Sequence, residues 1–410
     1  MALRALGRQA VALALVLVAC SGTGPRSRTS ASDATPTSSA AAPAEASVAG
    51  GTLVVVDGAG DIVTMRPDGS QRRALTDDGG VVGYRQPLWS PISDDLVWAA
   101  DDAADAGSAI VISDGVDLVS IAMPALPIFS MWSPDGSRIA VLHDGSGGGL
   151  DLEIINLATG DNSVVSVGAP FYFAWSPDGD LIAGHLVGQL LGLVGEDGIT
   201  PIAATAGDFQ APVWTDSGIF YFEGGSLVVR ADPEAEVRAI AGVTGPGTMV
   251  ATPVGNRLAV QIVGSDEPGV FASSRALPEI PAGAVIVLDV ETGSIDVAAG
   301  RTSFGHFWSP DGDALLLLVA ASTEGELEWW VWRDGAITTR VAFAPAAPLV
   351  RELLPFFDQY AQAWSPWAPD SSAFAFVGTI GSTTGVWVQE LGTADPQFVS
   401  DGDWVAWSAH

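Results

Sequence analysis

Polar and aromatic side chains come directly before several tryptophan-containing apolar segments of this 410-residue chain. Aromatic rings and hydrogen-bonding groups that converge on a concave mouth are the usual components of a binding site. If these apolar segments line one central channel, the residues that precede them lie together at one end of that channel. We expect a ligand to bind at that end. The candidate ligand-binding residues are Tyr84, Arg85, Gln86, Tyr172, Gln210, His306, Asp358, Gln359, Tyr360 and Trp404.

The same residues offer little for catalysis. His306 is the histidine of the set, but the sequence identifies no acid or nucleophile as its partner. His143 and His185 fall at the ends of corresponding strands in adjacent repeats, without the close spacing that metal ligands show. No Gly-x-Ser-x-Gly pentapeptide occurs, which argues against a serine peptidase with an α/β-hydrolase domain. We predict no catalytic residues, no metal and no cofactor.

The amino-terminal residues have the features of an export signal. Arg4 and Arg8 precede an apolar run, residues 11–18, which is too short to span a bilayer. The following Leu17-Val18-Ala19-Cys20 resembles a lipobox, and Cys20 is the sole cysteine of the chain. This resemblance implies a lipoprotein signal peptide over residues 1–19 and lipidation of Cys20. The anchor then lies in the outer leaflet of the cytoplasmic membrane, or in the outer membrane of a two-membrane envelope.

Residues 20–50 are rich in Ser, Thr, Ala and Pro and hold almost no large apolar side chain. Such a composition cannot bury a core, so we predict a flexible tether between the lipid and the folded domain. The domain itself is expected over residues 51–410.

Repeated hairpins are the elements that must position the candidate residues. Trp-Ser-Pro-Asp-Gly begins at Trp132, Trp175 and Trp308, and an aliphatic run follows each copy. Proline presets φ for a turn, aspartate caps it, and glycine supplies the positive φ that closes it. Each copy therefore predicts a strand, a tight turn and a returning strand.

Weaker copies extend the pattern along the chain, and we place the eight landmarks at residues 89, 132, 175, 214, 251, 308, 364 and 407. In the seventh copy, Trp364-Ser365-Pro366 is followed by a small insertion before Asp370. A period of about 40–45 residues with four short strands predicts an all-β fold, the β-propeller. We expect eight four-stranded blades, with seven as the alternative. The strand around Trp404 and Trp407 should complete the first blade and close the ring.

Two segments depart from the repeat, residues 264–280 and 344–362. In the second, Pro355 argues against a long helix and favours one short helical turn packed by its aromatic side chains.

The repeated Trp-Ser-Pro-Asp-Gly followed by Ile-Ala or Leu-Leu resembles the WD40-like (PD40) repeat of TolB-type propellers. The resemblance covers residues 52–408, nearly the whole folded domain. It implies the propeller fold, and the TolB family is associated with partners in the cell envelope. This chain differs in its lipobox and in having only the short polar tether where TolB has an amino-terminal domain.

The formal charge of −31 repels phosphate backbones, so a nucleic-acid partner is not expected. The sequence favours a non-catalytic, membrane-anchored extracytoplasmic lipoprotein, a monomer that binds a protein or envelope ligand. Two alternatives remain open: an enzyme, hydrolase or lyase, that works in the channel with or without a metal, and a carbohydrate or small-solute binding protein.

Overall fold

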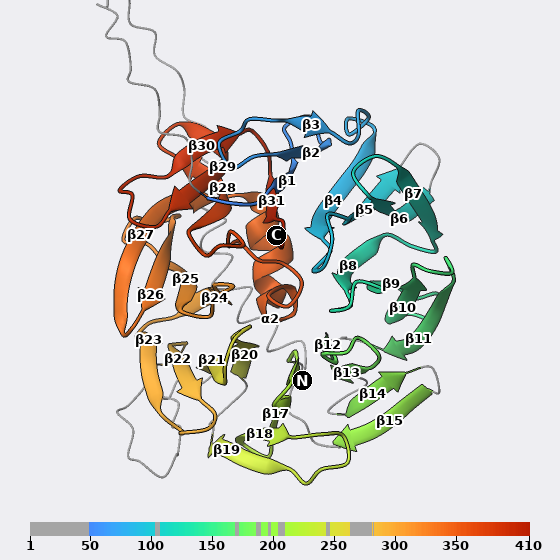
Figure 1. The fold of residues 1–410 in the computed structure, drawn as a ribbon, viewed down its shortest axis with the longest axis vertical. Coiled ribbons are helices and arrows are strands. Elements are labelled where there is room, and N and C mark those ends of the chain that lie inside the picture. Colours follow the sequence, from blue (N-terminus) through green and yellow to red (C-terminus); the bar gives the residue numbers. More distant parts are fainter. Residues whose placement is uncertain are drawn as a thin grey trace, which may run out of the picture.

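Hairpins with tight turns build a ring of blades around a central channel (Figure 1). The computed structural model describes residues 49–102, 107–168, 172–185, 190–195, 198–203, 210–242, 247–262, 281 and 283–410. These residues form six four-stranded sheets and one seven-stranded sheet, and the latter consists of two blades, β24–β27 and β28–β30. The prediction of an all-β propeller with eight blades is therefore confirmed.

Each blade is an antiparallel sheet whose strands follow one another outward from the channel (Figure 1). Blade 1 consists of β31 (Trp404–Trp407), β1 (Leu53–Val56), β2 (Ile62–Met65) and β3 (Arg73–Ala74). Blade 2 consists of β4 (Val82–Trp89), β5 (Leu96–Asp102), β6 (Gly107–Ser113) and β7 (Leu118–Met123). Blade 3 consists of β8 (Pro127–Trp132), β9 (Arg138–Asp144), β10 (Leu150–Asn156) and β11 (Asn162–Gly168). Blade 4 consists of β12 (Tyr172–Trp175), β13 (Ile182–His185), β14 (Leu191–Gly195) and β15 (Gly198–Ala203).

The second half of the ring follows the same plan. Blade 5 consists of β16 (Val213–Thr215), β17 (Gly218–Glu223), β18 (Ser226–Arg230) and β19 (Arg238–Gly242). Blade 6 consists of β20 (Gly247–Ala251), β21 (Arg257–Ile262), β22 (Val285–Asp289) and β23 (Ile295–Ala299). Blade 7 consists of β24 (Ser303–Trp308), β25 (Ala314–Ala320), β26 (Leu327–Arg333) and β27 (Ala336–Pro345). Blade 8 contains β28 (Ala373–Ile380), β29 (Thr383–Glu390) and β30 (Gln397–Ser400), with an isolated bridge between Trp367 and Phe374 at its inner edge.

The ring closes where the carboxyl-terminal strand pairs with the first strand of the domain. β31 runs antiparallel to β1, and Leu53 faces Trp407 while Val56 faces Trp404. This pairing supplies the inner strand of blade 1 and leaves neither strand with an unpaired edge there. The predicted closure is confirmed.

Tryptophans at the ends of inner strands join neighbouring blades. The indole N–H of Trp132 donates to the carbonyl of Leu88 in blade 2, over 3.4 Å, and that of Trp308 donates to Val250 in blade 6, over 3.1 Å. Both rings are buried, as predicted for side chains that fill the space between blades.

Blade 8 corrects the sequence-based alignment. The indole N–H of Trp367, and not that of Trp364, donates to the preceding blade, at the Phe307 carbonyl over 3.0 Å. Trp367-Ala368-Pro369-Asp370-Ser371 is thus the turn motif, without the insertion we expected after Trp364. Ser371 stands in the glycine position with a φ of 60°, close to the 68° of Gly136. The Trp364 indole donates instead to Val405 in blade 1, over 2.7 Å.

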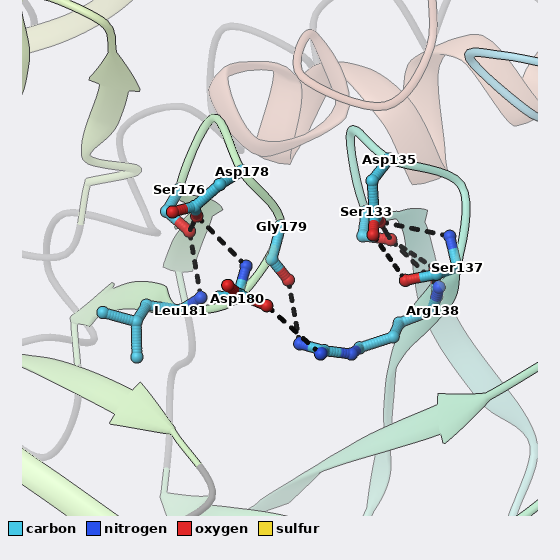
Figure 2. Close-up of polar contacts among 9 residues, drawn as sticks. All are labelled: Ser133, Asp135, Ser137, Arg138, Ser176, Asp178, Gly179, Asp180 and Leu181. Carbon is cyan, nitrogen blue, oxygen red and sulfur yellow. Dashed lines mark hydrogen bonds and ion pairs between the residues drawn. The ribbon is translucent and has the colours of Figure 1, made fainter.

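The Ser-Pro-Asp-Gly turns are held by their own side chains (Figure 2). Ser176 Oγ donates to Asp178 Oδ1 over 2.5 Å, and this bond is the main reason why the pKa of Asp178 lies below its usual value. Between blades 3 and 4, Arg138 donates to the carbonyl of Gly179 over 3.0 Å and contacts Asp180 Oδ1 at 3.2 Å. The aspartates therefore stabilise turns, as the sequence indicated.

The predicted signal peptide, Cys20, most of the tether and the departure at 264–280 lie outside the described residues. Among the residues that are described, no helix is long and apolar enough to cross a membrane.

Candidate functional site

The departure from the repeat after β27 enters the central channel (Figure 1). It comprises a π-helical turn η2 (Leu349–Leu353), a 3-10 turn η3 (Leu354–Phe356) and an α-helical turn α2 (Phe357–Tyr360). We call residues 349–360 the plug. The helix type changes around Pro355, because proline cannot continue an α-helix. The sequence correctly indicated a short helical turn in place of a long helix.

Consecutive plug residues bind consecutive blades. Asp358 accepts a hydrogen bond from the Ala211 N–H before blade 5, over 3.0 Å. Gln359 pairs with the backbone of Phe173 in blade 4, accepting its N–H at 2.7 Å and donating to its carbonyl at 3.0 Å. The Tyr360 hydroxyl donates to Ile128 in blade 3 over 3.2 Å. The plug thus occupies backbone groups that the inner strands present to the channel.

His306 meets the plug from blade 7. Its side chain is 0% exposed, and its ring lies 4.8 Å from that of Phe357. Burial lowers the pKa of His306 to about 3, although the backbone of Ala259 acts in the opposite direction. The imidazole is therefore neutral at pH 7 and closed off from solvent.

Asp358 lies in an equally enclosed setting. Burial raises its pKa above the usual range for aspartate, although the hydrogen bond from Ala211 opposes that shift. The pKa of Tyr172 is raised too, first by burial and then by the neighbouring Asp358. Among the described residues, no hydrogen-bond partner is found for the Gln210 amide, 6% exposed, or for the Thr248 hydroxyl, 8% exposed, which are buried in adjacent blades. Buried polar groups of this kind usually bind ordered water.

The plug also forms part of a more accessible rim beside blades 1 and 2. Gln86 Nε2 donates to Glu352 Oε2 over 3.3 Å, and Arg85 next to it is exposed. Gln86 has a φ of 52° within a β-bulge of β4, where the pairing with β5 shifts register. Desolvation is the main cause that raises the pKa of Asp403, and the negative charge of Glu352 adds to it. The positive charge of Arg85 lowers the same pKa. We call Arg85, Gln86, Glu352 and Asp403 the rim.

A small cavity separates the rim from the core of blades 7, 8 and 1. Its volume is about 20 Å³, and its walls include Leu349, Leu353, Trp364, Trp404 and Asp403. That volume is enough for about one water molecule. Trp404 is 6% exposed, and its indole N–H donates to Pro87 over 3.2 Å.

The ten residues predicted as a binding site fall into three groups in the structure. Arg85 and Gln86 lie at the rim. Tyr84 is engaged within the first two blades, with its hydroxyl on Asp78 at 2.7 Å and its ring against Trp98. The remaining seven pack around the plug or in the wall beside it: Tyr172, Gln210, His306, Asp358, Gln359, Tyr360 and Trp404.

Sequence reasoning missed Glu352 and Asp403 as partners of this site. Glu352 stands in the departure that we singled out, so its location was a usable signal. Pro87 directly after Gln86 was a usable signal for the bulge that turns Gln86 toward it, because proline inside a strand is found at edges and bulges.

A buried ionisable pair lies within blade 3. His143 Nε2 lies 3.0 Å from Glu153 Oε2 on the neighbouring strand of blade 3. Within the described part of the chain, no three His, Cys, Asp or Glu residues gather in a way that could hold a metal ion. The described geometry around the plug offers hydrogen bonds and apolar packing.

No family model and no curated protein sequence matches the chain. Among solved structures, a eukaryotic initiation factor matches with a TM-score of 0.53 and 11% identity, over 88% of this chain and 98% of that chain. TolB from Acinetobacter baumannii matches with a TM-score of 0.38 and 14% identity, over 71% of this chain and 63% of that chain. The β-propeller domain of the Trilobed protease from Pyrococcus furiosus matches with a TM-score of 0.43 and 15% identity, over 68% and 88%. At such low identities these likenesses concern the fold and assign no activity, so the chain is described by its architecture, a β-propeller of eight blades.

Proposed function

We propose that this protein is a non-catalytic binding propeller, tethered outside the cytoplasm by lipid on Cys20, which holds a protein or another envelope component at its rim. The main observation behind this proposal is the conformation of Gln86, whose positive φ is uncommon for a residue with a side chain. Backbone outliers of this kind persist where the surroundings impose them, and they gather at functional sites. Here the bulge presents Gln86 to Glu352 and leaves the neighbouring Arg85 exposed.

The plug supports this proposal by giving the rim a firm base. Its hydrogen bonds to blades 3, 4 and 5 and its packing on His306 of blade 7 fix it from several sides. A partner that docks on a fixed surface loses less conformational entropy than one that must order a loop. Arginine is also among the residue types that dominate binding energy.

Charge indicates what kind of partner the rim suits. The chain carries a formal charge of −31, and two of the four rim residues are acidic. Complementary potentials favour a partner that brings basic groups to Glu352 and Asp403 and an acceptor group to Arg85. The burial of His306 and its low pKa speak for binding over acid–base catalysis in the channel. We propose that the protein acts as a monomer.

The anchor is tested first. Cys20→Ser should release the full-length protein from the membrane fraction or leave it as an unprocessed precursor, because no thiol remains for lipid attachment. Fractionation and intact-mass analysis measure both results. A variant that is processed and sediments like the wild type would contradict the anchor.

The rim is tested by capture of partners from native membranes with full-length protein and a crosslinker. Once a partner has been identified, Arg85→Ala should weaken its binding by about 1–3 kcal/mol. Arg66→Ala, at another exposed arginine, is the matched control for loss of one positive charge. Equal affinity of the wild type and Arg85→Ala would move the partner site away from the rim.

A further inference from the structure

The inner hairpin of blade 5 is shorter than its counterparts. In blade 4, Trp175 pairs with Ile182, so six residues lie between them. In blade 5, Trp214 pairs with Ile219 and Thr215 with Gly218, so the turn has lost two residues. The shortening lies where the inner strands end, at the opposite end of the channel from the plug.

This junction also lacks a contact that closes two other junctions between blades. The strands β9 and β21 begin with Arg138 and Arg257, and each guanidinium donates to the glycine carbonyl in the turn of the next blade. The corresponding strand of blade 5, β17, begins with Gly218. No side chain at that position can reach across to blade 6.

A cleft opens at this junction, with a volume of about 440 Å³. It falls within the range of small-molecule sites, about 300–1,000 Å³. Its walls are Ser217, Phe220, Arg238, Asn256, Val290 and Glu291. The residues come from both blades, so a ligand here would bridge them.

The polar wall is held in place before any ligand arrives. Ser217 Oγ donates to Asn256 Oδ1 over 2.9 Å, and Asn256 Nδ2 donates to Glu291 Oε1 over 2.7 Å. The backbone fixes both ends of this chain of hydrogen bonds, because the Ser217 N–H donates to Thr215 Oγ1 and the Glu291 N–H to Asp289 Oδ1, each over 3.1 Å. A wall ordered in advance lowers the entropy cost of binding.

These side chains have both hydrogen-bond donors and hydrogen-bond acceptors left for a ligand. Asn256 keeps a second amide hydrogen, Glu291 keeps its other oxygen as an acceptor, and Arg238 offers donors only. A hydroxyl group both donates and accepts, and neighbouring hydroxyls on a sugar ring match such alternation. Phe220 and Val290, which are 2% and 8% exposed, form a small apolar floor beneath these polar groups.

Charge argues against the competing ligand classes. An anion would meet Glu291 and the field of a chain with a formal charge of −31. A calcium ion needs six to eight oxygen ligands, whereas this cleft contains one carboxylate. We propose that the cleft between blades 5 and 6 is a binding site for a neutral saccharide, separate from the rim.

Saturation-transfer NMR on the full-length protein, purified in a detergent without a sugar headgroup, tests the proposal. The probes are maltose, cellobiose and N,N′-diacetylchitobiose, with citrate as the anionic comparison. At least one disaccharide should receive saturation, and Arg238→Ala and Asn256→Ala should each weaken its binding at least tenfold. Arg66→Ala, which removes an exposed arginine of blade 1, should bind like the wild type.

A filled cleft provides the second test. Ser217→Trp places an indole in the cleft from an exposed turn position and should abolish binding, with an unchanged melting temperature as evidence of folding. Gly218 is unsuitable for this purpose, because a Cβ there would lie 2.4 Å from the Arg230 carbonyl oxygen. No signal from any disaccharide, a signal from citrate alone, or undiminished disaccharide binding in folded Ser217→Trp would each overturn the proposal.

Discussion

At one end of the channel the blades meet through repeated turns, whereas at the other end a single unrepeated segment, the plug, contacts one blade after another. At the turn end the same contact occurs at two junctions, from Arg138 to Gly179 and from Arg257 to Gly312. The plug end uses a different side chain for each blade. Repetition therefore builds the ring, and departures from repetition produce the surfaces with distinctive chemistry. The rim adjoins the added segment, and the cleft adjoins the shortened turn.

Removal of residues 403–410 should have the largest effect on this architecture, because it deletes the inner strand of blade 1. β1 would lose its pairing with β31, and the exposed edges would favour aggregation. We expect loss of cooperative thermal unfolding, measured by circular dichroism and size-exclusion chromatography. Removal of His410 alone is the control, since that residue lies beyond β31. A normal melting curve for the larger deletion would show that the ring holds without its closing strand.

The plug end should be broken by Tyr360→Ala. The ring of Tyr360 is buried and lies 5.0 Å from that of Phe129, so its removal should cost about 3–5 kcal/mol of unfolding free energy. Tyr360→Phe keeps the ring and loses the hydrogen bond to Ile128, with an expected cost of about 1 kcal/mol. Denaturant unfolding measures both variants. Similar values for the two would mean that packing of the plug contributes little to the stability of the ring.

The pH dependence of stability sharpens the comparison, because His306 belongs to the plug end. Its pKa is about 3 in the folded state, against a usual value of 6.5. The unfolded state therefore binds more protons between these values, and folding stability should fall as the pH drops from 6.5 toward 3. His306→Phe should remove that contribution, visible as a smaller loss of melting temperature over this window. His410, at the exposed chain end, offers His410→Phe as the control. Parallel pH profiles for the wild type and His306→Phe would contradict the buried neutral imidazole.

The smallest effect is expected at the turn end. Arg138 and Asp180 form an ion pair whose aspartate is 69% exposed, so Arg138→Ala should show a coupling to Asp180 of at most about 1 kcal/mol. A double-mutant cycle with Asp180→Ala isolates the pairwise part by denaturant unfolding. A coupling of several kcal/mol would show that single inter-blade contacts at the turns, and not the fit of the blades, hold the ring together.

The turns, and from their repetition the ring, could be predicted from the sequence because the hydrogen bonds that hold each turn lie within a few residues. Serine, proline, aspartate and glycine act on their own backbone within a few residues, as Ser176 and Asp178 do. The same local information was ambiguous in blade 8, where Trp364 and Trp367 stand three residues apart and both precede a turn-like segment. Only the bridge to Phe374 and the bond to Phe307 select Trp367.

Seven of the ten candidate residues lie around the plug or in the wall beside it, but their contacts could not be derived from their positions before the inner strands. The partners of the plug are far away along the chain: Gln359 and Phe173 are separated by 186 positions, and Tyr360 and Ile128 by 232. Lipidation of Cys20 remains a prediction from sequence. The sequence by itself determined the hairpins and a ring of seven or eight blades, because short-range hydrogen bonds and apolar alternation specify the hairpins. Only the tertiary structure decided that the plug enters the channel and that the shortened turn leaves a cleft, because both depend on how distant segments fill the space between blades.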